Sequence, residues 1–151
     1  MLPANSTSQR HFVVDASVAI KAFVEEEESA QASALLALIQ EPDAELHVPE
    51  LFFIEMTNIF WKCVQRGRLT LDDAKASVLT LPQLRLIAHP MTILITQAFD
   101  LAATYNISAY DAGYIALAAQ LKLPLITADN RLIEKLVGTP YVPVLLSQFP
   151  I

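Results

Sequence analysis

The sequence has only one cysteine, Cys63, among its 151 residues. A single cysteine excludes an internal disulfide framework and a metal site built from several thiolates. The ten N-terminal residues contain no apolar core of the kind that a signal peptide requires. We therefore expect a cytoplasmic protein with a loose tail over residues 1–10, followed by a single domain over residues 11–151.

Long hydrophobic runs are also missing, although the chain as a whole is apolar. Hydrophobic residues make up 54% of it and the mean hydropathy is +0.41, which excludes a disordered chain. No segment reaches the roughly 18 uninterrupted apolar residues that a membrane-spanning helix needs. Only three glycines are present, so long flexible loops are not expected. These features predict one soluble domain with a substantial core and no contact with a membrane.

Basic residues are fewer than acidic ones, 10 against 16, and the net charge is −6. This balance argues against a protein that nucleic acid holds by bulk charge alone. This argument weakens if several of the acids bind a divalent cation, because the cation would offset their negative charge. Basic residues near the site could then still bind phosphate groups.

Short apolar segments alternate with longer segments of helical spacing. The expected strands cover residues 12–15, 46–48, 84–88, 124–127 and 141–145, and the expected helices cover residues 17–23, 29–40, 50–66, 70–81, 92–105, 109–121 and 130–137. On the helix over residues 92–105 the side chains expected to face inward are Ile95, Ala98, Phe99, Leu101 and Ala102. This alternation is typical of an α/β fold, in which helices cover both faces of a parallel sheet.

Four carboxylates end or interrupt the apolar segments: Asp15, Glu55, Asp111 and Asp129. Carboxylates rarely occupy apolar surroundings unless they are paired, neutralised or bound to a metal. Asp15 and Asp129 directly follow expected strands, and sites in parallel sheets lie at the carboxyl ends of the strands. The four acids therefore suggest one shared cation site.

Three of these acids also have a purely structural interpretation. Asp129 can cap the helix that follows it, and Asp15 can do the same for its own helix, where Ser17 competes for the position. Asp111 can belong to a capping box that Ser108 opens.

Glu55 has no such capping role, because it lies inside the helix over residues 50–66. It shares a narrow polar stripe with Asn58 and Lys62 on an otherwise apolar helix. This stripe indicates either a lined cleft or a solvent-exposed strip of no consequence.

Carboxylate oxygens are the ligands that Mg²⁺ and Mn²⁺ prefer. Such ions polarise a phosphoryl group and lower the pKa of a bound water, which is the chemistry of phosphodiester hydrolysis. The three histidines, His11, His47 and His89, follow no ligand spacing, and we expect them to be structural or exposed.

Four segments occur in a recognisable order: Val13–Val18 around Asp15, Pro49–Asn58 around Glu55, Tyr110–Ala118 around Asp111, and Leu125–Leu132 around Asp129. Together they resemble the PIN-domain family, and within it the VapC-type toxins of prokaryotic toxin–antitoxin pairs. The resemblance implies a three-layer α/β/α sandwich with a central, mainly parallel sheet. It also implies a metal-dependent endoribonuclease that hydrolyses RNA phosphodiester bonds with Mg²⁺ or Mn²⁺.

On this resemblance Asp15, Glu55, Asp111 and Asp129 are the acidic quartet. Thr127 matches the Ser/Thr that accompanies the fourth acid, and Asn58 matches the Asn one turn after the helix acid. The family usually forms homodimers, and its toxins bind an antitoxin protein, so both partners are implied here.

Further residues are expected to support the quartet. Ser17 and Thr127 are placed to orient carboxylates by hydrogen bonds. The substrate contacts that we expect come from Lys21, Lys62 and Arg131, whose alternative role is that of scattered solubilising charges.

Other functions remain open at this point. The same quartet could serve another Mg²⁺-dependent nuclease or phosphohydrolase that acts on DNA, or the domain could be a non-catalytic binding module. A phospho-receiver domain is less consistent with the sequence, because it requires paired acids after the first strand and Asp15 stands alone there.

Overall fold

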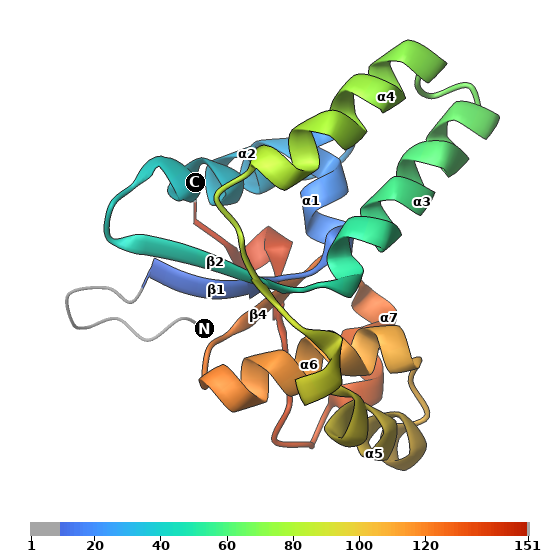
Figure 1. Ribbon diagram of the computed structural model, residues 1–151. Helices are drawn as coiled ribbons and strands as arrows, with labels where there is room; N and C mark the ends of the chain where they lie inside the picture. Colours follow the sequence, from blue (N-terminus) through green and yellow to red (C-terminus); the bar gives the residue numbers. More distant parts are fainter. Residues whose placement is uncertain (1–9, 151) are drawn as a thin grey trace.

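The computed structural model describes residues 10–150, so that residues 1–9 of the expected tail and residue 151 lie outside the described residues (Figure 1). Five strands form one sheet: β1 (Arg10–Val14), β2 (Ala44–Pro49), β3 (Ile87–His89), β4 (Leu125–Thr127) and β5 (Val144–Leu145). Their order is β3-β2-β1-β4-β5, and every pairing is parallel. The predicted parallel sheet is confirmed, and its first strand includes Arg10, which the sequence predicts to belong to the tail.

Seven α-helices connect the strands: α1 (Ala16–Phe23), α2 (Ser29–Ala37), α3 (Leu51–Gln65), α4 (Leu71–Thr80), α5 (Ile95–Tyr105), α6 (Ala109–Leu121) and α7 (Asn130–Leu136). Figure 1 shows α1 to α4 on one side of the sheet and α5 and α6 on the other. This arrangement confirms the three-layer α/β/α sandwich. Within the described residues, no helix is long and apolar enough to cross a membrane.

Several elements are shorter than expected: β5 begins at Val144 instead of residue 141, α2 ends at Ala37 and α5 begins at Ile95. β3 begins at Ile87 instead of residue 84, because the chain first makes a 3₁₀ turn over Leu81–Gln83 and a tight turn in which the Leu86 amide donates to the Leu84 carbonyl. On α5, Ala98 and Leu101 are buried as expected, but Ile95 and Phe99 are 55% and 71% exposed. The expectation that these two side chains face inward is therefore wrong. Apolar residues cover more of this helix than its buried face requires, so periodicity alone does not select the face.

One glycine of α6, Gly113, faces the first turn of α3. A Cβ atom added at Gly113 would lie 3.0 Å from Leu51 Cδ2 and 3.3 Å from Met91 Cε. Such distances are too short for an unadjusted contact between carbon atoms. A side chain at this position would therefore require the ends of the Leu51 and Met91 side chains to move by a few tenths of an ångström, where α6 faces the first turn of α3.

Candidate active site

Asp15 is the most constrained of the four acids. It follows β1 directly, is 5% exposed, and caps α1. Its Oδ2 accepts hydrogen bonds from Ser17 Oγ at 2.9 Å and from Thr127 Oγ1 at 2.8 Å. Burial raises the pKa of Asp15, an effect that these hydrogen bonds oppose. The two hydroxyl groups therefore hold Asp15 in place, as the sequence predicted for Ser17 and Thr127.

Asp129 comes two residues after the end of β4, the strand that pairs with β1. Its Oδ1 accepts hydrogen bonds from the amides of Arg131 at 2.9 Å and Leu132 at 3.2 Å, which confirms that it caps α7. Its own amide donates to Thr127 Oγ1 at 3.1 Å. Its charge also acts on the site, because it raises the pKa values of Asp15 and Asp111. Capping and membership of the acidic cluster are therefore compatible.

Asp111 lies in the first turn of α6, where its amide donates to Ser108 Oγ at 3.0 Å. The expected cap by Ser108 is thus present. Burial raises the pKa of the Asp111 carboxyl to about 6, and the negative charge of Asp15 contributes to the rise. Lys135 on α7 acts in the opposite direction and lowers this pKa.

Glu55 reaches the same cluster from the middle of α3. Its pKa is raised to about 7, chiefly by burial and also by the charges of Asp15 and Asp111, while the Tyr114 side chain on α6 acts in the opposite direction. Among the described residues, neither Glu55 Oε1 nor the Tyr114 hydroxyl oxygen has a hydrogen-bond partner of acceptable geometry, although both are buried. A buried polar atom without a partner requires an explanation such as an ion or an ordered water.

The donor set fits a hard divalent cation. Four carboxylates from two helices and two strand ends lie close enough for their charges to raise one another's pKa values, and one buried oxygen, Glu55 Oε1, forms no hydrogen bond of acceptable geometry within the described part of the chain. A cation placed among them would bind that oxygen and would offset the burial and the mutual repulsion that together raise the pKa values of these acids.

The basic side chains are less closely associated with these acids. Lys21 Nζ donates to the Glu27 carbonyl at 3.0 Å and lies 3.6 Å from Glu26 Oε1, so its charge is engaged between α1 and α2. Lys62 and Arg131 are exposed, as is Asn58, one turn after Glu55. Over residues 10–150, none of the three cations forms an ion pair with the quartet. Their role in substrate binding stays a prediction.

Two residues that influence the quartet were not expected. Tyr114 follows Asp111 by three residues on α6, and this i,i+3 spacing was a readable signal that both side chains share one face. Lys135 had no local signal. It comes near Asp111 only because α7 folds back to the α5–α6 connection, where Lys135 Nζ donates to the Asn106 carbonyl at 2.9 Å.

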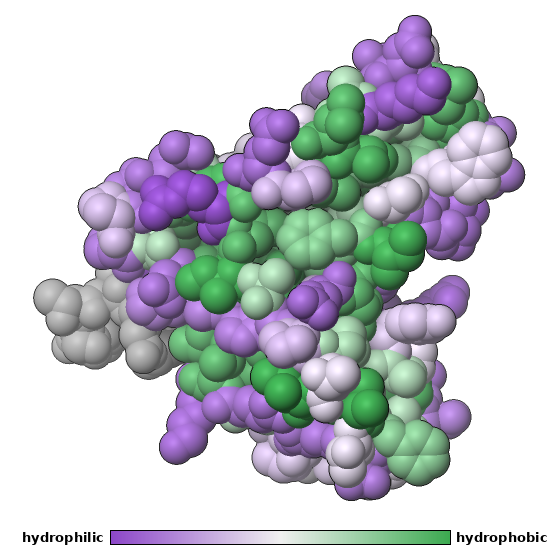
Figure 2. Space-filling view, in the orientation of Figure 1, coloured by the Kyte–Doolittle hydropathy of each residue, from purple (hydrophilic) through white to green (hydrophobic). Residues whose placement is uncertain are grey.

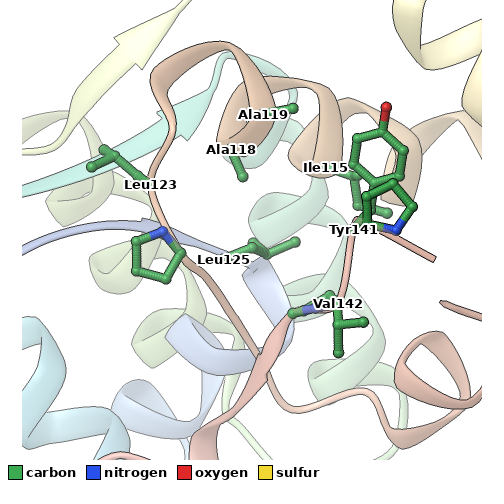
Figure 3. A pocket seen from close by; sticks show the side chains of 10 residues that line it. Ile115, Ala118, Ala119, Leu123, Leu125, Tyr141 and Val142 are labelled. Atoms are coloured by element: carbon green, nitrogen blue, oxygen red, sulfur yellow. The ribbon is translucent and has the colours of Figure 1, made fainter. Parts of the chain in front are cut away.

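A cavity elsewhere on the molecule does not include any of the four acids. This cavity has a volume of about 240 Å³. Figure 3 shows the mainly apolar side chains that line it, among them Ile115, Leu125 and Tyr141. It lies where the chain enters β4, whereas Thr127 and Asp129 lie where the chain leaves it. The acidic cluster is therefore the site to which the chemistry points.

The raised pKa values predict how stability depends on pH without metal. Glu55 titrates near 4.5 when unperturbed and at about 7 in the fold, and Asp111 rises from 3.8 to about 6. The folded state therefore binds more protons than the unfolded state in this range, so the free energy of unfolding falls as pH rises. We expect a lower melting temperature at pH 8 than at pH 5 in EDTA, and recovery when Mg²⁺ is added at pH 8. A melting temperature that rises over this interval in EDTA would contradict the proposed electrostatics.

Comparison with known proteins places the chain among relatives. The sequence profile of the PIN domain matches residues 12–136. Ribonuclease VapC3 of Pyrobaculum aerophilum is 36% identical over 125 residues, which cover 82% of this chain and 92% of that protein.

Solved structures share the fold at lower identity. A crystal structure of a Pyrobaculum aerophilum protein has a TM-score of 0.64 at 22% identity and covers 91% of this chain and 84% of that one. A toxin–antitoxin complex from Klebsiella pneumoniae has a TM-score of 0.59 at 18% identity, with coverage of 87% and 95%. The profile match covers most of β1, all of β2, β3 and β4, and all four acids, and the chain therefore belongs to the PIN-domain family.

Proposed function

We propose that this protein is an endoribonuclease that hydrolyses RNA phosphodiester bonds with Mg²⁺ or Mn²⁺, and that it is the toxin of a toxin–antitoxin pair. The observation that carries the proposal is the convergence of Asp15, Glu55, Asp111 and Asp129, with Glu55 Oε1 buried and unpartnered among the described residues. The curated relative named above is a ribonuclease, which supports RNA as the substrate.

Asp15 and Asp111 would hold the cation most directly, with Glu55 binding it either directly or through water and Asp129 completing the site. When bound, the ion would polarise the phosphoryl group and lower the pKa of a water molecule. Ser17 and Thr127 keep the Asp15 carboxylate oriented by the hydrogen bonds already described. Glu55 and Asp111 would release their protons as the cation binds, because a carboxylate must be ionised to act as a ligand.

Contacts with the RNA backbone would come from exposed groups around the acids. Arg131 at the start of α7 and Lys62 on the Glu55 stripe are available for this, and the Asn58 amide lies between Lys62 and Glu55 on α3. Lys21 would have to leave Glu26 to contribute. RNA binding should then weaken as salt concentration rises.

The test is a cleavage panel with single-stranded RNA, single-stranded DNA and duplexes, each in Mg²⁺, Mn²⁺ and EDTA. We expect cleavage of RNA in either metal and none in EDTA. Cleavage of DNA alone would favour the alternative nuclease or phosphohydrolase. If Mn²⁺ at millimolar concentration does not bind in a calorimetric titration, the protein is a non-catalytic binding module instead.

We further propose an antitoxin protein as partner. Apolar side chains gather over the arm that α3 and α4 form (Figure 2), and they line a groove of about 430 Å³ there. Trp61, Leu71 and Leu79 at this groove are 52%, 50% and 70% exposed. An amphipathic helix of the partner could cover such a groove, and a small protein encoded beside this one is the first to test.

A homodimer is the second assembly that we propose. Ile93, Ile95 and Phe99 expose apolar area before and along α5, at 55%, 55% and 71%. Contiguous exposed apolar groups of this kind often mark an interface. Light scattering of the purified chain would report its mass in solution.

A further inference from the structure

Three side chains that could ligate a metal meet on the sheet, away from the acidic quartet. The parallel pairing of β1 with β2 sets His11 opposite Glu45 and Val13 opposite His47. Because side chains alternate between the faces of a strand, His11, Glu45 and His47 share one face. His89, from β3, reaches His47 on this same face.

The ligand atoms are already close to the spacing of a tetrahedral zinc site. Glu45 Oε2 lies 3.1 Å from His47 Nε2 and 3.6 Å from His11 Nδ1. One ligand atom from each of the three residues lies within 4.8 Å of a ligand atom from each of the other two. Around Zn²⁺, with bonds of about 2.0–2.2 Å, two tetrahedral ligand atoms stand about 3.3–3.5 Å apart. Both contacts of Glu45 bracket this value, so small rotations of the side chains would admit the ion.

His47 is prepared for such a role by its surroundings. Its side chain is 9% exposed, whereas those of His11 and Glu45 are 35% and 47% exposed, so the cluster is anchored on one side and open on the other.

His89 supplies the support that metal-binding histidines usually have. Its Nε2 lies 3.0 Å from His47 Nδ1. With a metal on His47 Nε2, the Nδ1–H of His47 would donate to His89 Nε2, and this hydrogen bond would fix the ring and its tautomer. Without metal, His47 Nε2 can instead donate to Glu45 Oε2. The hydrogen bond between the two histidines can thus persist in both states, with its direction reversed.

We propose that His11 Nδ1, Glu45 Oε2 and His47 Nε2 form a Zn²⁺ site, with water in the fourth position and His89 as a positioning residue. The site is distinct from the quartet, because His11 precedes Asp15 by four residues of extended chain, or about 13 Å. Its nitrogen ligands favour Zn²⁺, whereas the oxygen ligands of the quartet favour Mg²⁺. Bound Zn²⁺ would link β1 to β2 and stabilise the folded chain.

The experiment is a competition titration of the full chain with Zn²⁺ against a chromogenic chelator, in excess Mg²⁺ to occupy the quartet. We expect one Zn²⁺ per chain, and a loss of affinity of more than about 10-fold in His11→Ala and in Glu45→Gln, both partly exposed positions. His89→Phe should weaken binding by about 10- to 100-fold while the stoichiometry stays the same. Glu25→Gln, which removes an exposed carboxylate between α1 and α2, is the matched control and should bind as the parent does.

Two further measurements separate this site from the quartet. Asp111→Asn should retain Zn²⁺ binding, and Co²⁺ in place of Zn²⁺ should give the intense visible absorption of a four-coordinate ion. Unchanged affinity in both His11→Ala and Glu45→Gln would overturn the proposal. So would loss of Zn²⁺ binding in Asp111→Asn, or no binding of Zn²⁺ by the parent chain, in which case the cluster is only a hydrogen-bonded group.

Discussion

Asp15→Asn and Asp111→Asn are each expected to lower Mg²⁺-dependent RNA cleavage by about 10³-fold while the fold survives. Asparagine keeps the shape of the side chain but removes the negative charge that would hold the cation. An asparagine at position 15 can still cap α1 and accept hydrogen bonds from Ser17 and Thr127. The measurement is the rate of RNA cleavage under single-turnover conditions, with circular dichroism to verify the fold.

The matched control for this prediction is Asp72→Asn. Asp72 lies in the first turn of α4, as Asp111 does in α6, but it is exposed and distant from the quartet. Its replacement should leave the cleavage rate within about twofold of the parent, since surface changes of this kind are nearly neutral. Full activity in Asp15→Asn or Asp111→Asn would exclude the proposed role of the quartet.

Glu55→Gln should change activity and stability in opposite directions. Cleavage should fall by about 10²-fold, because a ligand of the cation is lost. The metal-free protein should become more stable at pH 8, by about 1–2 kcal/mol, because the charged form of Glu55 is disfavoured by burial and by the neighbouring acids. Stabilisation by added Mg²⁺ should shrink at the same time.

Chemical denaturation at pH 8, in EDTA and in Mg²⁺, measures both effects on stability. Glu134→Gln, an exposed position on α7, is the control and should show neither effect. If Glu55→Gln is instead less stable than the parent in EDTA, the Glu55 carboxylate is satisfied within the protein itself, and its role as a ligand for a cation fails.

Much of the site could be predicted because each of its acids lies beside a feature that can be recognised in the local sequence. Asp15 and Asp129 end apolar strands, and a parallel sheet brings such ends to one edge. Asp111 follows a recognisable helix start at Ser108, and Glu55 interrupts an apolar helix. Each signal lies within a few residues of the acid itself, so no knowledge of long-range contacts was needed.

The histidine cluster could not be predicted in this way. His11, His47 and His89 lie on three strands, and only the register of the sheet brings them together. Register depends on how the whole sheet packs, so no short segment encodes it. The outward orientation of Phe99 could not be predicted for a related reason. An apolar side chain can pack against the protein's own core, or it can face outward to a surface that another molecule could cover, and the sequence of the helix does not distinguish the two.

The helix starts beside the acids carry an electrostatic consequence. α1 begins right after Asp15, and α6 begins two residues before Asp111, so the positive ends of two helix dipoles lie next to these carboxylates. Their backbone amides offset part of the negative potential that four acids would otherwise project into the surrounding water. A chain with a net charge of −6 can therefore present a locally mixed field, in which a phosphodiester anion can approach once a divalent cation is in place.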